Sequence, residues 1–223
     1  KRNRLEPEYE ILDTGVFDNN QYFDVQVTYA KHSAQDIFIK IDITNRNTKA
    51  APVTVLPTLW FYNRWTHTPD DEKPVISLLD KTSVNAKHHR LGNYYFYFQT
   101  PDDRLFTENE TNFNKVDGSV NKTPFTKDAF HDAVITGVNR TKLRTKKEGT
   151  KFSPVYELNI QGGEAKTIYC RLTNKANDKP FGPGFEKIFS PRKQEADEFY
   201  NTILPSGISE DRKNIQRQAL AGL

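Results

Sequence analysis

The sequence contains one cysteine, no methionine and no long uninterrupted run of apolar residues. A single cysteine, Cys170, excludes both an internal disulfide framework and a zinc site built from several cysteines. Its alternation with Ile168 and Leu172 predicts a small core residue instead. No stretch approaches the roughly 18 apolar residues that a membrane span needs, so we expect no membrane partner. No signal peptide is visible, which favours the cytoplasm but leaves the compartment unknown.

The chain also has little excess charge of either sign. Its 32 Lys and Arg residues and 29 Asp and Glu residues leave a net charge of +3, with the two signs interspersed. That pattern is typical of a solvated surface, so we expect no nucleic-acid partner. One basic run occupies residues 140–151. We favour a charged hairpin loop that discourages edge pairing over a loop that contacts phosphate.

What the sequence does contain is a two-residue alternation of apolar and polar side chains. It is clearest at residues 37–44, where isoleucines occupy alternate positions, as in a half-buried β-strand. Pro57 predicts a bulge or a sheet edge, and Gly162-Gly163 predicts a tight hairpin. Evenly spaced strands over this length predict a mainly β fold, a large antiparallel β-sandwich (super-sandwich) followed by C-terminal helices. The expected strands are residues 23–29, 37–44, 53–62, 94–98, 105–108, 133–138, 155–160 and 166–172.

After Leu172 the composition changes and the apolar period becomes helical. Ser190-Pro191 predicts the start of one helix and Ser209 predicts the N-cap of another. We therefore expect a β-sandwich domain at residues 1–174, and a linker with helices at residues 175–223. Because the chain lacks methionine and stops within a helical pattern, we expect it to be a piece of a longer polypeptide. The apolar face of the last helix is then expected to be exposed at Ile215, Ala219, Leu220 and Leu223.

Two segments carry side chains that suit a hydroxyl-rich ligand. Residues 108–112 are polar throughout, and their carboxylates and amides can accept and donate hydrogen bonds. The alternative is a turn whose side chains bond to their own backbone. Residues 60–65 hold both tryptophans, whose flat rings suit either sugar stacking or a protein interface. We expect both segments on one side of the sandwich. The candidate binding residues are Trp60, Trp65, Glu108, Asn109, Glu110 and Asn112.

The sequence offers no convincing catalytic or metal-binding pattern. No two of its five histidines have the four-residue spacing of a zinc protease motif. It has no glycine-rich phosphate loop and no acid–base carboxylate pair that stands out from the solvated loops. We therefore expect no catalytic residue, no metal and no cofactor in this chain.

Six motifs together resemble a known family. They lie at residues 8–25, 55–65, 105–112, 127–131, 195–200 and 217–222, and include VLPTLWFYNRW, LFTENETN and EADEFY. In these motifs the chain resembles bacterial proteins of glycoside hydrolase family 63, relatives of the processing glucosidase that trims mannosyl-oligosaccharides. The resemblance spans nearly the whole chain, with departures mostly at residues 66–90 and 139–151.

The resemblance implies an N-terminal β-sandwich that packs on a C-terminal (α/α) barrel and supports it. Such enzymes hydrolyse α-glucosidic bonds with inversion, using two carboxyl groups about 6.5–9.5 Å apart. In the family both groups lie on the barrel, beyond Leu223, so no catalytic residue is carried over. The implied partner is the chain's own barrel, with an oligosaccharide as a candidate second partner. A stand-alone carbohydrate-binding module and a structural interaction module remain as alternatives.

Overall fold

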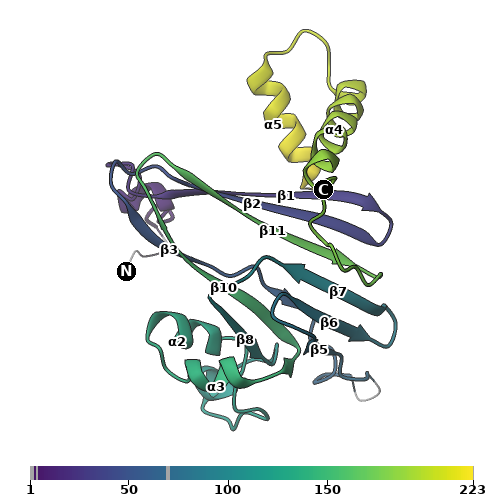
Figure 1. Ribbon diagram of the computed structural model, residues 1–223. Coiled ribbons are helices and arrows are strands. Elements are labelled where there is room, and N and C mark those ends of the chain that lie inside the picture. The colour runs from purple at the N-terminus through teal and green to yellow at the C-terminus, as the bar shows by residue number, and fades with distance from the viewer. Residues whose placement is uncertain (1–2, 4, 69–70, 223) are drawn as a thin grey trace.

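The computed structural model describes residues 3, 5–68 and 71–222, and it shows a mainly β protein with helices at its C-terminal end (Figure 1). The strands are β1 (Phe23–Ser33), β2 (Asp36–Asn45), β3 (Ala51–Val55), β4 (Leu59–Trp60), β5 (Val75–Leu78), β6 (Ser83–His88), β7 (Gly92–Phe98), β8 (Asp103–Thr107), β9 (Glu148–Gly149), β10 (Lys151–Ile160) and β11 (Ala165–Thr173). The helices are α1 (Phe113–Asp117), α2 (Ala129–Ile135), α3 (Arg140–Thr145), α4 (Phe189–Ile203) and α5 (Glu210–Ala221), with 3₁₀ turns η1 (Ile11–Thr14) and η2 (Glu186–Ile188).

The strands form two antiparallel sheets of unequal width. The larger has seven strands in the order β1-β2-β11-β7-β6-β5-β9, and the smaller has four strands arranged around β10. Val55 of β3 pairs with Tyr156 of β10, and Trp60 of β4 pairs with Lys151 of β10 in the same register. The expected strand at residues 53–62 is therefore one strand interrupted around Pro57, which has no N–H to donate. The predicted antiparallel β-sandwich followed by helices is confirmed.

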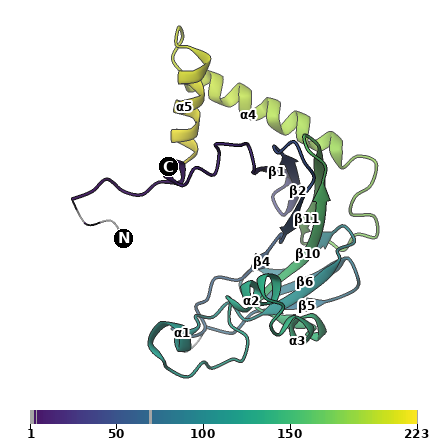
Figure 2. The same cartoon turned by 90° about the vertical axis from the view of Figure 1, so that its left-hand side faces the viewer.

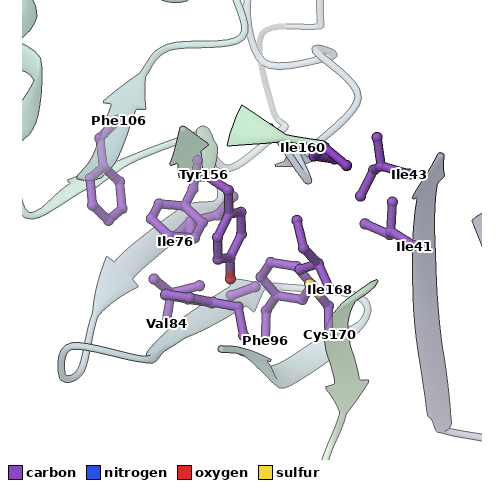
Figure 3. Close-up of a cluster of buried hydrophobic side chains, with 13 residues drawn as sticks. Ile41, Ile43, Ile76, Val84, Phe96, Phe106, Tyr156, Ile160, Ile168 and Cys170 are labelled. Carbon is purple, nitrogen blue, oxygen red and sulfur yellow. The ribbon is translucent and has the colours of Figure 1, made fainter. Parts of the chain in front are cut away.

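The main core fills the space between the sheets with aromatic and branched side chains (Figure 3). Phe98 from β7 meets Phe106 and Phe152 from the smaller sheet, and all three side chains are fully buried. The Phe152 ring centroid lies 4.7 Å from that of Phe106 and 5.3 Å from that of Phe98. Cys170 is fully buried in the same core, as its alternation predicts.

The smaller sheet is too narrow to cover the whole inner face of the larger one. The strand β1 continues that inner face outward, and its Val25, Val27 and Tyr29 side chains are exposed, Tyr29 by 68%. These side chains, with Ile41 beside them on β2 and Trp60 of the smaller sheet, line an apolar groove of about 480 Å³ between the two sheets. The edge of the sandwich at β1 is therefore open and apolar.

The helices α4 and α5 are attached to the outer face of the larger sheet by a small aromatic cluster. Phe185 stacks on Phe38 with ring centroids 4.5 Å apart, and the Arg171 guanidinium lies over the same Phe38 ring while pairing with Asp36 at 2.7 Å. Beyond this cluster both helices project away from the sheets (Figure 2). Ser209 caps α5 as predicted, its hydroxyl accepting from the Arg212 N–H.

The exposed face predicted for the last helix is confirmed at three positions. Ile215 is 60% exposed, and Ala219 and Leu220 are exposed as well. Leu223 lies outside the described residues. The start predicted at Ser190 is off by two residues, because η2 leads directly into α4.

Two strand or loop predictions are wrong because short apolar runs hide a helical period. The first half of the predicted strand at residues 133–138 is the end of helix α2 and the rest is turn; Phe130 and Ala133 of that helix are buried three residues apart. The basic run at residues 140–151 is no hairpin loop: it begins with helix α3, which buries Leu143 beneath its charges. Short runs of this kind cannot be assigned from periodicity alone.

The predicted hairpin at Gly162-Gly163 is also wrong, because β10 and β11 belong to different sheets. The glycines have another role. A Cβ on Gly162 would lie 2.3 Å from the Thr48 carbonyl carbon, and Gly163 has φ of +75°. The turn therefore needs glycine for close approach to the β2–β3 loop and for a left-handed backbone. The strands β5 and β6 carry no alternation strong enough to be predicted.

We predict that Cys170 is unreactive in the folded protein. Burial raises the pKa of its thiol to about 12, so thiolate is scarce at neutral pH. Because the thiol pKa is higher in the folded state than in the unfolded chain, the protonated thiol contributes to folding stability. That contribution is complete below the unfolded pKa of about 8.5 and is lost as the pH rises through the folded pKa. Labelling with a thiol reagent at pH 8 should require denaturant. Rapid labelling of the native chain would show that the apolar groove opens onto the core.

Candidate functional site

The strand β10 brings the two candidate segments together. Its residue Lys151 pairs with Trp60 of β4 on one side and with Thr107 of β8 on the other. Residues 60–65 and 108–112 leave these two strands directly, so both loops start from the same end of the smaller sheet. The prediction that they share one side of the sandwich is confirmed.

The two loops are joined by direct hydrogen bonds. The indole N–H of Trp65 donates to Glu110 Oε1 at 3.0 Å, and the Asn109 side-chain amide donates to the Phe61 carbonyl at 2.8 Å. The Asn109 backbone N–H donates to Thr150 Oγ1 at 2.7 Å, at the start of β10. Trp65 and Asn109 therefore fix one loop against the other.

Both carboxylates of the polar segment are held by one lysine. Lys73 Nζ lies 3.1 Å from Glu108 Oε2 and 3.5 Å from Glu110 Oε1, and these side chains are only 14% and 8% exposed. The Thr150 hydroxyl donates to Glu108 Oε2 at 2.9 Å. Buried carboxylates are costly unless they are paired and hydrogen-bonded, and this pair satisfies that condition.

Asn112 organises the next stretch of the loop. Its side-chain oxygen caps α1 by accepting from the Lys115 N–H at 3.2 Å, and also accepts from the Asn121 amide at 2.9 Å. Its own amide donates to Asp128 at 2.9 Å. Partial burial alone would raise the pKa of Asp128, but hydrogen bonds from Lys115, Thr126 and Asn112 outweigh it and lower that pKa well below its usual range.

Trp60 does not belong to this polar cluster. Its side chain is 55% exposed and lines the apolar groove beside β1. The six predicted site residues thus separate into three groups. Trp65, Glu108, Asn109 and Glu110 share one network with Lys73 and Thr150. Asn112 caps α1 with partners of its own, and Trp60 is exposed on an apolar surface. A role in binding is untested for all six.

A small polar pocket next to the cluster was not predicted. It has a volume of about 180 Å³ and is lined by Asn63, Thr66, His67, Glu110, Thr111, Phe113 and Lys122. Of these, only Glu110 had been singled out as a ligand-binding candidate. The sequence signal was weak, because the pocket joins residues 63–67 to residues 110–122, which lie more than 40 positions further along the chain.

The described part of the chain holds no group of three or more His, Cys, Asp or Glu residues placed to bind a metal ion. No helix within residues 3, 5–68 and 71–222 is long and apolar enough to cross a membrane.

Comparison with known proteins gives one informative likeness. No family model matches the chain. The uncharacterized protein YMR196W of Saccharomyces cerevisiae is 29% identical over 268 aligned residues, which include the whole of this chain. The alignment covers 24% of the yeast protein, so the chain spans about a quarter of the length of the curated relative it matches. The chain is therefore similar to part of a longer protein, and the comparisons assign the chain to no family.

We predict that Lys73 stabilises the fold through both carboxylates. Lys73→Met leaves two poorly exposed charges without their cation, so the free energy of unfolding should fall by about 1–3 kcal/mol. In a background carrying Glu108→Gln and Glu110→Gln the same change should cost much less, because the interaction is already absent. Lys142→Met, on the exposed side of α3, is the control, with an expected change within about 0.5 kcal/mol. Equal losses in both backgrounds, measured by denaturant unfolding, would refute the network.

Proposed function

We propose that this chain is a non-catalytic β-sandwich domain of a glycoside hydrolase that cleaves α-glucosidic bonds with inversion. The domain packs on a catalytic barrel and supports it. The observation that carries the proposal is the apolar surface that the described chain leaves uncovered. The resemblance of the motifs at residues 55–65 and 105–112 supplies the enzyme class.

The uncovered surface lies in three places. It includes the inner face of β1 at Val25, Val27 and Tyr29, and the projecting helices, where Phe199 and Ile215 are exposed. The segment before β1 exposes further apolar side chains, at Leu5, Ile11, Leu12, Val16 and Phe17. Each large apolar side chain left in water forgoes roughly 1.5–3 kcal/mol of burial. Extended apolar surface on a folded domain is typical of a protein–protein or domain interface.

The polar cluster supports a non-catalytic role. An inverting hydrolase needs room for a water molecule between its two carboxyl groups. Here Glu108 and Glu110 both lie within 3.5 Å of the Lys73 ammonium group. Both carboxylates therefore hold loops together, and neither is free to act as acid or base.

We predict that the exposed helix face makes the isolated chain bind apolar dye and self-associate. The paired changes Ile215→Ser and Leu220→Ser should lower dye fluorescence and the apparent mass in solution. Their melting temperature should stay close to that of the parent chain, since neither side chain is buried. Asn214→Ser, on the same helix, should leave all three measurements unchanged. A large drop in melting temperature would show that these side chains pack within the monomer.

We also predict that the full-length yeast relative hydrolyses α-glucosidic bonds and that the isolated chain does not. The substrates are α-linked glucosyl disaccharides and an aryl α-glucoside. Proton NMR of the first product formed by the relative should show β-glucose, the anomer that inversion yields from an α-glucoside. Release of α-glucose, or no turnover of any of these substrates, would contradict the proposal. Turnover by the pure isolated chain that disappears in Glu108→Gln or Glu110→Gln would contradict its non-catalytic role.

A further inference from the structure

We infer that the polar pocket between Asn63, Glu110, Phe113 and Lys122 binds one neutral pyranose ring. This inference rests on the proposed function and extends it, since it gives a supporting domain its own sugar contact. The volume of about 180 Å³ is below the roughly 300–1,000 Å³ of pockets for larger organic ligands, so one ring is the appropriate size.

The lining offers the groups that bind hydroxyls. Asn63 uses its side-chain oxygen to accept from the Thr66 N–H and hydroxyl, and its amide nitrogen has no acceptor among the described residues. Lys122 is exposed and makes no ion pair within the described chain. Glu110 uses Oε1 for Trp65 and Lys73, so its contribution to a ligand is the other carboxylate oxygen, Oε2, and Thr111 adds a hydroxyl. Hydrogen-bond donors and acceptors that line the same pocket suit the neighbouring hydroxyl groups of a sugar, because each hydroxyl both donates and accepts.

An aromatic ring completes the pocket. Phe113, the first residue of α1, is 38% exposed although it lines the cavity. The backbone on both sides of Phe113 is anchored, because Asn121 accepts from the Asn114 N–H at 3.2 Å and donates to Asn112 at 2.9 Å. Lys122, which lines the same pocket, follows Asn121 directly in the chain. A partly exposed ring beside hydrogen-bonding groups suits the apolar face of a sugar.

The pocket lining carries charged groups of both signs. The lining itself holds the Glu110 carboxylate and the Lys122 ammonium group, one charge of each sign, together with the imidazole of His67. Behind the lining, Lys73 pairs with both Glu108 and Glu110. An anion would meet the buried Glu110 carboxylate, and a cation would meet Lys122. A neutral polyhydroxyl ligand satisfies both without placing a charge next to one of its own sign.

The test is a titration of the isotope-labelled chain with methyl α-D-glucopyranoside, followed by amide NMR. Shifts should be confined to the pocket residues, with a dissociation constant on the order of 1 mM for a ligand of about a dozen heavy atoms. Phe113→Ala should weaken binding at least about fivefold, whereas Phe113→Tyr, which keeps a ring, should not. Val116→Ala is the matched control, since Val116 is an exposed residue of the same helix outside the pocket.

Three outcomes would overturn the inference. The first is the absence of amide shifts at sugar concentrations well above the expected dissociation constant. The second is equal weakening of binding by Phe113→Ala and Val116→Ala. The third is tighter binding of the anionic glucose 6-phosphate than of methyl α-D-glucopyranoside. A failed sugar titration would leave the argument from the apolar surface and the result of the inversion assay unaffected. It would therefore refute sugar binding in the pocket but not the supporting role of the domain. A failed inversion assay with sugar binding intact would instead identify a carbohydrate-binding module.

Discussion

The unequal width of the two sheets is the constraint on which the rest of the structure depends. Four strands cannot cover seven, so the core covers β2, β11, β7, β6 and β5 and leaves the inner face of β1 open. The side chains of that face stay apolar, as in a buried strand, although water now reaches them. The projecting helices and the segment before β1 carry the same kind of uncovered surface (Figure 2). A partner domain packed against this apolar surface would bury these side chains and extend the hydrophobic core of the chain.

The strand β10 explains why the most conspicuous polar motif is structural. Because β4 and β8 pair with opposite sides of its first residues, the two loops that follow them must meet. Their carboxylates then lie in a poorly exposed position, and Lys73, Thr150 and Trp65 neutralise and bond them. The groups that remain available for a ligand are therefore mostly those next to the motif, at Asn63, Phe113 and Lys122, with Thr111 and one oxygen of Glu110 from the motif itself.

The fold class could be predicted from the sequence because strict alternation has a single structural meaning. Residues 37–44 form the centre of β2, and the cap at Ser209 lies where its residue type predicts. The errors come from signals that depend on distant contacts. Leu143 alone distinguishes α3 from a charged loop, and Gly162 is explained only by the close approach of Thr48. The candidate cluster was found, but not Lys73, since an isolated lysine in a loop carries no sequence signal.

The central claim is that the open apolar surface is an interface, and hydrogen exchange tests it most directly. The region of the yeast relative that matches this chain would be compared alone and within its full-length protein. The account predicts slower amide exchange in the full-length protein at the positions of β1, α4 and α5, and little change in the core strands β7 and β10. Equal exchange at β1, α4 and α5 in the two forms would contradict it, because that surface would then have no partner in the protein that contains it.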